Sequence, residues 1–295
     1  MAVFVVLIII SNVLLSAVYY VNKVMLNSNF YQLTYYLFNG KAGSGSFKVV
    51  MDTIITCIPF ALLSIIVTVL PIILVKHFKW FSVKKFIKIY AISLLCFCVL
   101  LTLHSYQFDD YVINKSKKTD IYKYYKDTNK VNVSFKGKKR NLILIYLESV
   151  ESSLMSKENG GLFNKSRIPE LETLALENDN FSNTDKLGGG KNLTVSSFTM
   201  ASLVASSSGT PLDIKIFGGY NEKNKIMPEV KTLGDILKEN GYNLKVIQGT
   251  DINFSATDQY YKIHGDYEIV DYNEMIKKGY VPKGYLEWWG IEDKK

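Results

Sequence analysis

The sequence predicts an α/β protein in which N-terminal transmembrane helices precede an α/β domain with a mainly parallel sheet. The first observation is a set of three long uncharged segments before residue 109. The second is the alternation of strand-like and helix-like runs after residue 140, which is typical of a parallel sheet. The third is the charge of the loops, which fixes the side of the membrane on which each part is expected.

The three uncharged runs are each long enough to cross a bilayer, since a spanning helix needs about 20 mostly apolar residues. They predict transmembrane helices at about 2–22, 53–75 and 89–108, which together form a membrane module over residues 1–108. The first run could also be a signal peptide, but it lacks a basic start and a clear small-residue cleavage site. A retained helix is therefore expected.

The loop between the second and third runs, residues 76–88, carries five lysines and no acid. Short lysine-rich loops face the cytoplasm. The N-terminus is then cytoplasmic, whereas the 22–52 loop and everything after about residue 108 are external. We expect a multi-pass protein of the cell membrane whose α/β domain is extracellular.

The net charge of +8 does not indicate a nucleic-acid-binding protein. Five positive charges belong to the cytoplasmic loop, and arginine, the usual reader of phosphates and bases, occurs only at Arg140 and Arg167. The remaining basic excess suits anionic lipid headgroups. Because Cys57, Cys96 and Cys98 all lie in predicted membrane helices, the exported part has neither a disulfide framework nor a cysteine zinc site.

After the membrane module, residues 109–139 are rich in Lys, Asp, Tyr and Asn and predict a juxtamembrane linker, although a surface helix fits equally well. The α/β domain is expected over residues 140–295. Its predicted elements are a buried strand at 141–147, helices at 169–178, 199–206 and 232–240, and a strand at 244–248. Gly241 is expected to end the third of these helices in a left-handed conformation.

Acidic side chains follow both predicted strands, and sites in such sheets gather at the carboxyl ends of the strands. Glu148 is either a metal ligand or a strand-end acid bonded to backbone amides or solvent, and position alone favours the second reading. Asp251 and Asp258 are either ligand contacts or solvated loop acids. His264 could bind metal or phosphate, or serve as a structural hydrogen-bonding group.

Thr199 follows a glycine-rich loop, residues 188–190, and opens a predicted helix. A hydroxyl there could attack phosphorus or hold a phosphate, because the amides and dipole of a helix N-terminus attract anions. The simpler reading is that Thr199 is an N-cap, with Ser196 or Ser197 as rivals, and spacing alone favours it. Trp288 and Trp289 could line a cleft, rest against the bilayer or pack in the core.

Several segments resemble the lipoteichoic acid synthase and phosphoglycerol transferase group of the sulfatase and alkaline phosphatase superfamily. They are NLILIYLES (141–149), IPEL (168–171), TDKLGGG (184–190), FTMASLVAS (198–206), GTPL (209–212), GTD (249–251) and HG (264–265). The resemblance covers essentially all of residues 140–295. The preceding helices also fit the family's plan of a membrane module followed by an extracellular domain.

The resemblance implies that Glu148 and Thr199 bind a divalent metal, often Mn²⁺, and that Thr199 is the nucleophile. It implies attack on phosphatidylglycerol, release of diacylglycerol, and passage of phosphoglycerol from Thr199 to a glycan, glycolipid or polyglycerolphosphate acceptor. His264 and Asp251 are then candidate substrate contacts. The alternatives are a phosphoethanolamine transferase or a sulfatase of the same superfamily, or a non-catalytic lipid-binding membrane protein. Thr199 argues against a sulfatase, which needs Cys or Ser there.

One departure concerns the metal site, which the family completes with a downstream Asp-His pair that this sequence lacks. Two ligands would hold a divalent ion poorly, because catalytic sites commonly offer three protein ligands. We therefore expect the sequence to be the N-terminal portion of an enzyme, with a C-terminally incomplete α/β domain that does not turn over as written.

Overall fold

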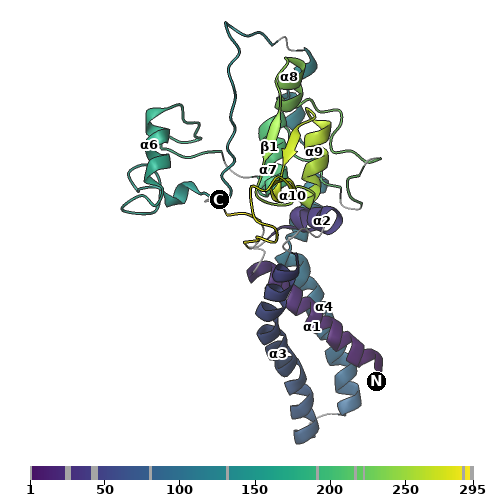
Figure 1. The fold of residues 1–295 in the computed structure, drawn as a ribbon. Coiled ribbons are helices and arrows are strands. Elements are labelled where there is room, and N and C mark those ends of the chain that lie inside the picture. Colours follow the sequence, from purple (N-terminus) through teal and green to yellow (C-terminus); the bar gives the residue numbers. More distant parts are fainter. Residues whose placement is uncertain are drawn as a thin grey trace.

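The computed structural model describes residues 2–23, 28–40, 46–79, 82–130, 133–190, 193–215, 218–221, 223–287 and 290–292. Three of the described helices are long and apolar enough to cross a membrane: α1 (Ala2–Lys23), α3 (Ser46–Phe78, with its apolar stretch at Ile54–Phe78) and α4 (Val83–Ser105). In Figure 1 they run side by side as a bundle, with the N-terminus, the C-terminal end of α3 and the N-terminal end of α4 far from the rest of the chain.

Polar side chains join these helices where they face one another. Asn12 of α1 donates to Thr68 Oγ1 of α3 at 3.1 Å and accepts from Ser64 Oγ at 2.9 Å. The Tyr90 hydroxyl of α4 donates to the carbonyl of Thr68 at 2.9 Å. Hydrogen bonds and close packing associate helices in lipid, where apolar burial supplies no driving force. The three helices therefore form one unit.

Two short helices lie at the other end of the bundle. α2 (Phe30–Asn39) connects α1 to α3, and α5 (Phe108–Lys115) follows α4. The ring of Phe30 packs against that of Phe108 with centroids 5.0 Å apart, and Tyr31 packs against Tyr111 at 5.6 Å. The segment 109–139 thus begins as a helix and continues through the 3₁₀ turns η1 (Ile121–Lys123) and η2 (Thr128–Lys130).

The α/β part contains α7 (Thr199–Ser208), α8 (Leu233–Glu239), β1 (Lys245–Ile247), α9 (Thr257–Ile263), β2 (Glu268–Val270) and α10 (Tyr272–Lys277). β1 and β2 are parallel, with Val246 opposite Ile269, and α9 forms the crossover between them. The predicted helices at 199–206 and 232–240 and the predicted strand at 244–248 are confirmed. Gly241 has a φ of +80° after α8, as expected of a left-handed helix end.

The prediction of a buried strand at residues 141–147 is wrong for the described structure. The segment is extended but belongs to no sheet, and Ile143 and Ile145 are 80% and 76% exposed. A continuous apolar run becomes a buried strand only where neighbours cover both faces of its sheet, and the described sheet consists of β1 and β2 alone. The segment lies beside α7, because the Tyr146 hydroxyl is 3.4 Å from Ser206 Oγ.

A separate unit surrounds α6 (Pro169–Glu177), the helix predicted at 169–178, and the turn η3 (Ser152–Leu154), and it projects away from the sheet in Figure 1. Glu172 of α6 is buried and accepts from the Ser156 amide at 3.1 Å and from Asn159 Nδ2. This carboxylate therefore holds the loop before α6 against the helix.

Candidate active site

Thr199 is the first residue of α7, and its side chain is exposed. The N-cap position is taken by Phe198, which makes no side-chain capping bond. Thr199 is therefore inside the first turn, where the leading backbone amides have no partner within the helix and carry the positive end of its dipole. The simpler reading, in which Thr199 is itself the N-cap, does not describe this helix.

The orientation of α7 follows from its apolar face. Phe198, Met200, Ala201, Leu203 and Val204 are all at most 8% exposed and form the centre of the core of the α/β part. Burying that face fixes the rotation of the helix. Its first turn then presents Thr199 to the outside, and the left-handed Gly209 ends the helix.

Glu148 follows the extended segment 141–147 and is also exposed. Its charge acts on Tyr36 of α2, whose ring packs against that of Phe198 with centroids 5.7 Å apart. The pKa of Tyr36 is raised to about 12, mainly by burial; a hydrogen bond with Gln32 acts to lower it, and the charge of Glu148 acts to raise it. Tyr36 is thus a common neighbour of Glu148 and of the residue that precedes Thr199.

The donor set suits a hard divalent cation only in part. A carboxylate and a hydroxyl are oxygen donors of the kind Mg²⁺ and Mn²⁺ accept. Within the described ranges, however, no three His, Cys, Asp or Glu side chains gather in a way that could hold a metal ion. Glu148 and Thr199 by themselves fall short of a complete metal site.

The loop after β1 holds the two other acids. Asp251 Oδ1 accepts from the amide and the side chain of Asn253, both at 2.9 Å, in a tight turn that leaves the residue half-buried. Asp258 is 7% exposed, and its Oδ1 has no hydrogen-bond partner among the described residues. Between them, Ser255 and Ala256 both adopt left-handed backbone angles, with φ of +60° and +57°.

His264 is buried, and both of its ring nitrogens contact acceptors within the protein. Nδ1 lies 3.2 Å from Asp235 Oδ2 and Nε2 lies 3.0 Å from the carbonyl oxygen of Ile226. Burial acts to raise the pKa of Asp235, but the hydrogen bonds from His264 and Thr232 outweigh it, so this pKa is lowered. The geometry of His264 is that of a structural hydrogen-bonding group.

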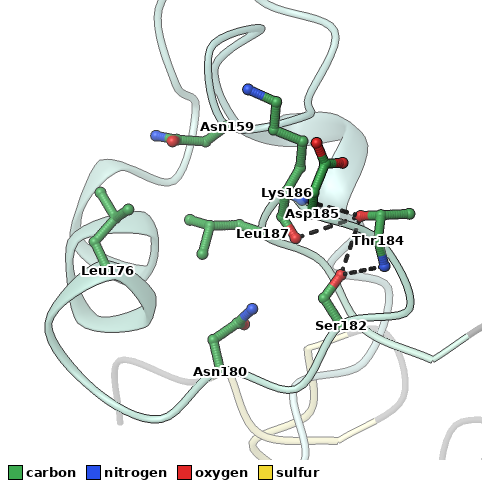
Figure 2. A pocket seen from close by; sticks show the side chains of 8 residues that line it. All are labelled: Asn159, Leu176, Asn180, Ser182, Thr184, Asp185, Lys186 and Leu187. Atoms are coloured by element: carbon green, nitrogen blue, oxygen red, sulfur yellow. Dashed lines mark hydrogen bonds between the residues drawn. The ribbon is translucent and has the colours of Figure 1, made fainter.

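Two cavities of about 410 Å³ each are formed by described residues, and neither includes Thr199. Figure 2 shows the first, which belongs to the α6 unit and is lined by Asn159, Leu176, Asn180, Ser182, Thr184, Asp185, Lys186 and Leu187. The second lies between α2 and the loops around α7, and it is lined partly by Asp213 and Glu229. Two acids make it a poor site for a phosphodiester. Trp288 and Trp289 lie outside the described residues.

The residues that the sequence reading missed are Tyr35 and Tyr36, which come from the loop between the first two membrane helices. Tyr35 is fully buried in the core beside Phe198. The signal that could have found them is the concentration of aromatic residues in FYQLTYYLF, residues 30–38. An external loop that is only a connector has no reason to be so apolar.

Comparison with known proteins gives one family. A model of the sulfatase family matches residues 140–294. Phosphoglycerol transferase I of Escherichia coli O6:K15:H31 (strain 536 / UPEC) is 32% identical over 175 residues, which are 59% of this chain and 21% of that protein. Phosphoglycerol transferase I of Shigella boydii serotype 18 (strain CDC 3083-94 / BS512) is 31% identical over the same shares.

The matched region thus spans about a fifth of the length of these curated relatives, 21%. No solved structure matches the chain significantly.

Proposed function

The chain belongs to the sulfatase family, and we propose that it is a membrane-anchored phosphoglycerol transferase that takes phosphoglycerol from phosphatidylglycerol. The observation that carries the proposal is the position of Thr199, exposed in the first turn of a helix whose N-cap is a different residue. The likeness to phosphoglycerol transferase I supports this substrate class.

The proposed reaction consists of two successive transfers of the phosphoglycerol group. Thr199 Oγ1 attacks the phosphorus of phosphatidylglycerol, the bond to the diacylglycerol oxygen breaks, and diacylglycerol leaves with a proton. An acceptor hydroxyl then attacks the same phosphorus, and Thr199 recovers its proton as phosphoglycerol leaves. The amides of the first turn of α7 stabilise the negative charge that develops on the phosphoryl oxygens. The acceptor class is a glycan, a glycolipid or a polyglycerolphosphate.

A divalent cation, which we propose to be Mn²⁺, would lower the pKa of the attacking hydroxyl and neutralise phosphoryl charge when bound. Glu148 and Thr199 are the two residues proposed to contact it. Asp251, at the carboxyl end of β1, is the proposed substrate contact, and His264 supports the site through Asp235 and the chain at Ile226.

The proposed location is the cell membrane, with the sulfatase domain on the extracellular side. Three helices that are long and apolar enough to cross a membrane support it. The N-terminus, the C-terminal end of α3 and the N-terminal end of α4 also lie at the end of the bundle opposite that domain (Figure 1). The lysines near those ends of α3 and α4 would then face the cytoplasm.

The test uses the protein expressed from its native gene, in vesicles that contain headgroup-labelled phosphatidylglycerol and Mn²⁺. We expect the label to become attached to Thr199, as read by mass spectrometry of the peptide, and the Thr199→Ala variant to remain unlabelled. Ser202→Ala is the matched control, because Ser202 is an exposed hydroxyl on the next turn of the same helix.

Labelling that survives in Thr199→Ala would refute the nucleophile. Preference for labelled phosphatidylethanolamine would make the protein a phosphoethanolamine transferase instead. Lipid binding without labelling, together with no Mn²⁺ binding by calorimetry, would make it a non-catalytic lipid-binding protein.

A further inference from the structure

We propose that α2, the short helix between the first two membrane helices, is a positioning element of the transfer site. Tyr35 and Tyr36 hold the two segments that flank the site, so the site is assembled only while α2 is docked on the sulfatase domain. The part of the inference that concerns transfer rests on the proposed function. The part that concerns docking rests on contacts alone.

Tyr35 connects the membrane module to the core of the sulfatase domain. It is 0% exposed, and its ring packs against Phe198 at 5.3 Å and against Tyr220 at 6.3 Å. Its hydroxyl donates to the carbonyl oxygen of Ser255 at 2.6 Å. Burying a ring of this size contributes strongly to stability. α2 therefore contacts both the residue before Thr199 and the loop that follows β1.

The hydrogen bond from Tyr35 is accepted by Ser255, whose backbone is strained. Ser255 and Ala256 are consecutive non-glycine residues in the left-handed region, with φ of +60° and +57°, which is unfavourable for residues with a Cβ atom. Such a conformation persists only where its surroundings enforce it. The Tyr35 hydroxyl bonds the carbonyl at the centre of this turn, which sits between Asp251 and Asp258. Tyr35 is thus one of the groups that maintain the turn.

Tyr36, the next residue of α2, contacts the same two segments. Its ring packs against Phe198 at 5.7 Å and against Phe254 at 5.6 Å. Its hydroxyl stays neutral at physiological pH, because burial raises its pKa to about 12. Tyr36 lies in the field of Glu148 and beside Phe198, so movement of α2 would alter the surroundings of both proposed site residues.

Both ends of α2 are fixed. At its N-terminal end, Phe30 packs on Phe108 and Tyr111 of α5, which continues from the third membrane helix. At its C-terminal end, Asn39 Oδ1 accepts from the Tyr220 amide at 2.7 Å. A Cβ on Gly219 would lie 2.4 Å from the carbonyl oxygen of Phe38, so the backbones approach too closely for any other residue.

These contacts place α2 between the membrane helices and the sulfatase domain, as Figure 1 shows. A helix anchored on the bilayer side and packed under the first turn of α7 fixes the nucleophile at a set distance from the membrane surface. A donor lipid that stays embedded in the bilayer would then meet Thr199 without movement of the sulfatase domain relative to the membrane. Preorganisation of this kind contributes to catalysis by orientation.

The test compares Tyr35→Phe and Tyr36→Leu with Tyr124→Leu in the full chain in phosphatidylglycerol vesicles. Tyr124 is the control, since it is a tyrosine of the juxtamembrane segment that is 84% exposed. The first readout is amide hydrogen exchange in peptides covering 193–200 and 252–258. We expect Tyr35→Phe to accelerate exchange in 252–258 by about five-fold, the equivalent of one lost hydrogen bond. The thermal midpoint of the domain should stay close to wild type.

The second readout is labelling of Thr199 as a function of donor concentration. Both variants should lower the maximal rate while leaving the half-saturating donor concentration unchanged, whereas Tyr124→Leu should change neither. Unchanged exchange in both peptides would overturn the docking role. Faster exchange spread evenly over the whole domain would show a merely structural contribution and would also overturn it. Absence of any labelling in the wild type refutes the proposed function, and the exchange result then still decides whether α2 holds the two segments.

Discussion

At the scale of single residues, the Asp235 carboxylate forms hydrogen bonds with more separate segments of the sulfatase domain than any of the acids proposed for the site. Its Oδ2 accepts from the amide and the hydroxyl of Thr232 at 2.8 and 2.9 Å, and it lies 3.2 Å from His264 Nδ1. His264 Nε2 in turn lies 3.0 Å from the carbonyl oxygen of Ile226, which is fully buried. One carboxylate thus caps α8 and fixes the histidine that follows α9.

We predict that Asp235→Asn lowers the free energy of unfolding at pH 7 by about 1–3 kcal/mol, the cost of leaving buried donors without an ionised acceptor. The pKa of Asp235 is lowered in the folded protein, so its contribution is present above the unfolded value of about 3.9 and is lost as the pH falls through the folded value. Urea unfolding at pH 7 and pH 3 checks this. Equal stability of the two proteins at pH 7 would contradict it.

Glu172 plays the corresponding part in the α6 unit. Hydrogen bonds from Asn159, Ser156 and Ser166 hold its pKa at about 2, against a weaker effect of burial. The stabilisation is therefore complete above the unfolded value of about 4.3 and disappears as the pH falls from there towards 2. We predict that residues 153–168 of the wild type open to protease between pH 4 and pH 2.

In Glu172→Gln the same residues should already be cleaved at pH 6, with little further change on acidification. Glu170→Gln is the matched control, because Glu170 lies on the exposed side of the same helix. Identical cleavage of the two variants at pH 6 would show that Glu172 does not hold the loop.

At the scale of elements, the sequence predicted those whose signals are local. α7 was predicted as a helix at 199–206 that follows a glycine-rich loop, and β1 was predicted as a strand at 244–248. α2 could not be predicted in this way, because its position is fixed by contacts with Phe198 and Ser255, which lie far along the chain. Contacts between distant segments leave no periodic trace in either one. The sequence predicted the types of residue at the site. It did not predict that α2 would pack against Phe198 and against the loop that follows β1.

The extended segment 141–147 shows the opposite case, in which a strong local signal did not decide the outcome. Apolarity alone indicates burial, but a strand also needs partners for its amides and carbonyls. We predict that Ile143→Lys changes the free energy of unfolding by less than about 0.5 kcal/mol, as expected at an exposed position. It should also reduce aggregation, because an exposed apolar strand can pair with other chains.

Chemical denaturation and light scattering on the purified chain measure the two effects. Val204→Lys is the contrasting variant, since Val204 is 1% exposed in α7, and it should prevent folding. A large loss of stability in Ile143→Lys would mean that the segment is covered in solution by another chain.

At the scale of the whole molecule, the arrangement of the helices makes a topology that can be measured. The C-terminal end of α3 and the N-terminal end of α4 lie at one end of the bundle, and α2, α5 and the sulfatase domain lie at the other (Figure 1). Basic helix ends facing the cytoplasm then require the domain to face outward. The same arrangement supports the proposed meeting of a donor lipid with Thr199. The proposed nucleophile belongs to a domain that contacts, through α2, the end of the helices that we propose to face outward.

We predict that Ser82→Cys and Tyr124→Cys, each in a chain without the native cysteines, react oppositely with a membrane-impermeant thiol reagent. In intact cells Tyr124→Cys should be labelled and Ser82→Cys protected, because Ser82 directly precedes α4 and Tyr124 follows it in the chain, on the side of the sulfatase domain. Permeabilised cells serve as the control and should label both. Labelling of Ser82→Cys alone in intact cells would place the sulfatase domain in the cytoplasm. It would then exclude phosphatidylglycerol of the outer leaflet as the donor, whereas the contacts of α2 with the domain would stand unchanged.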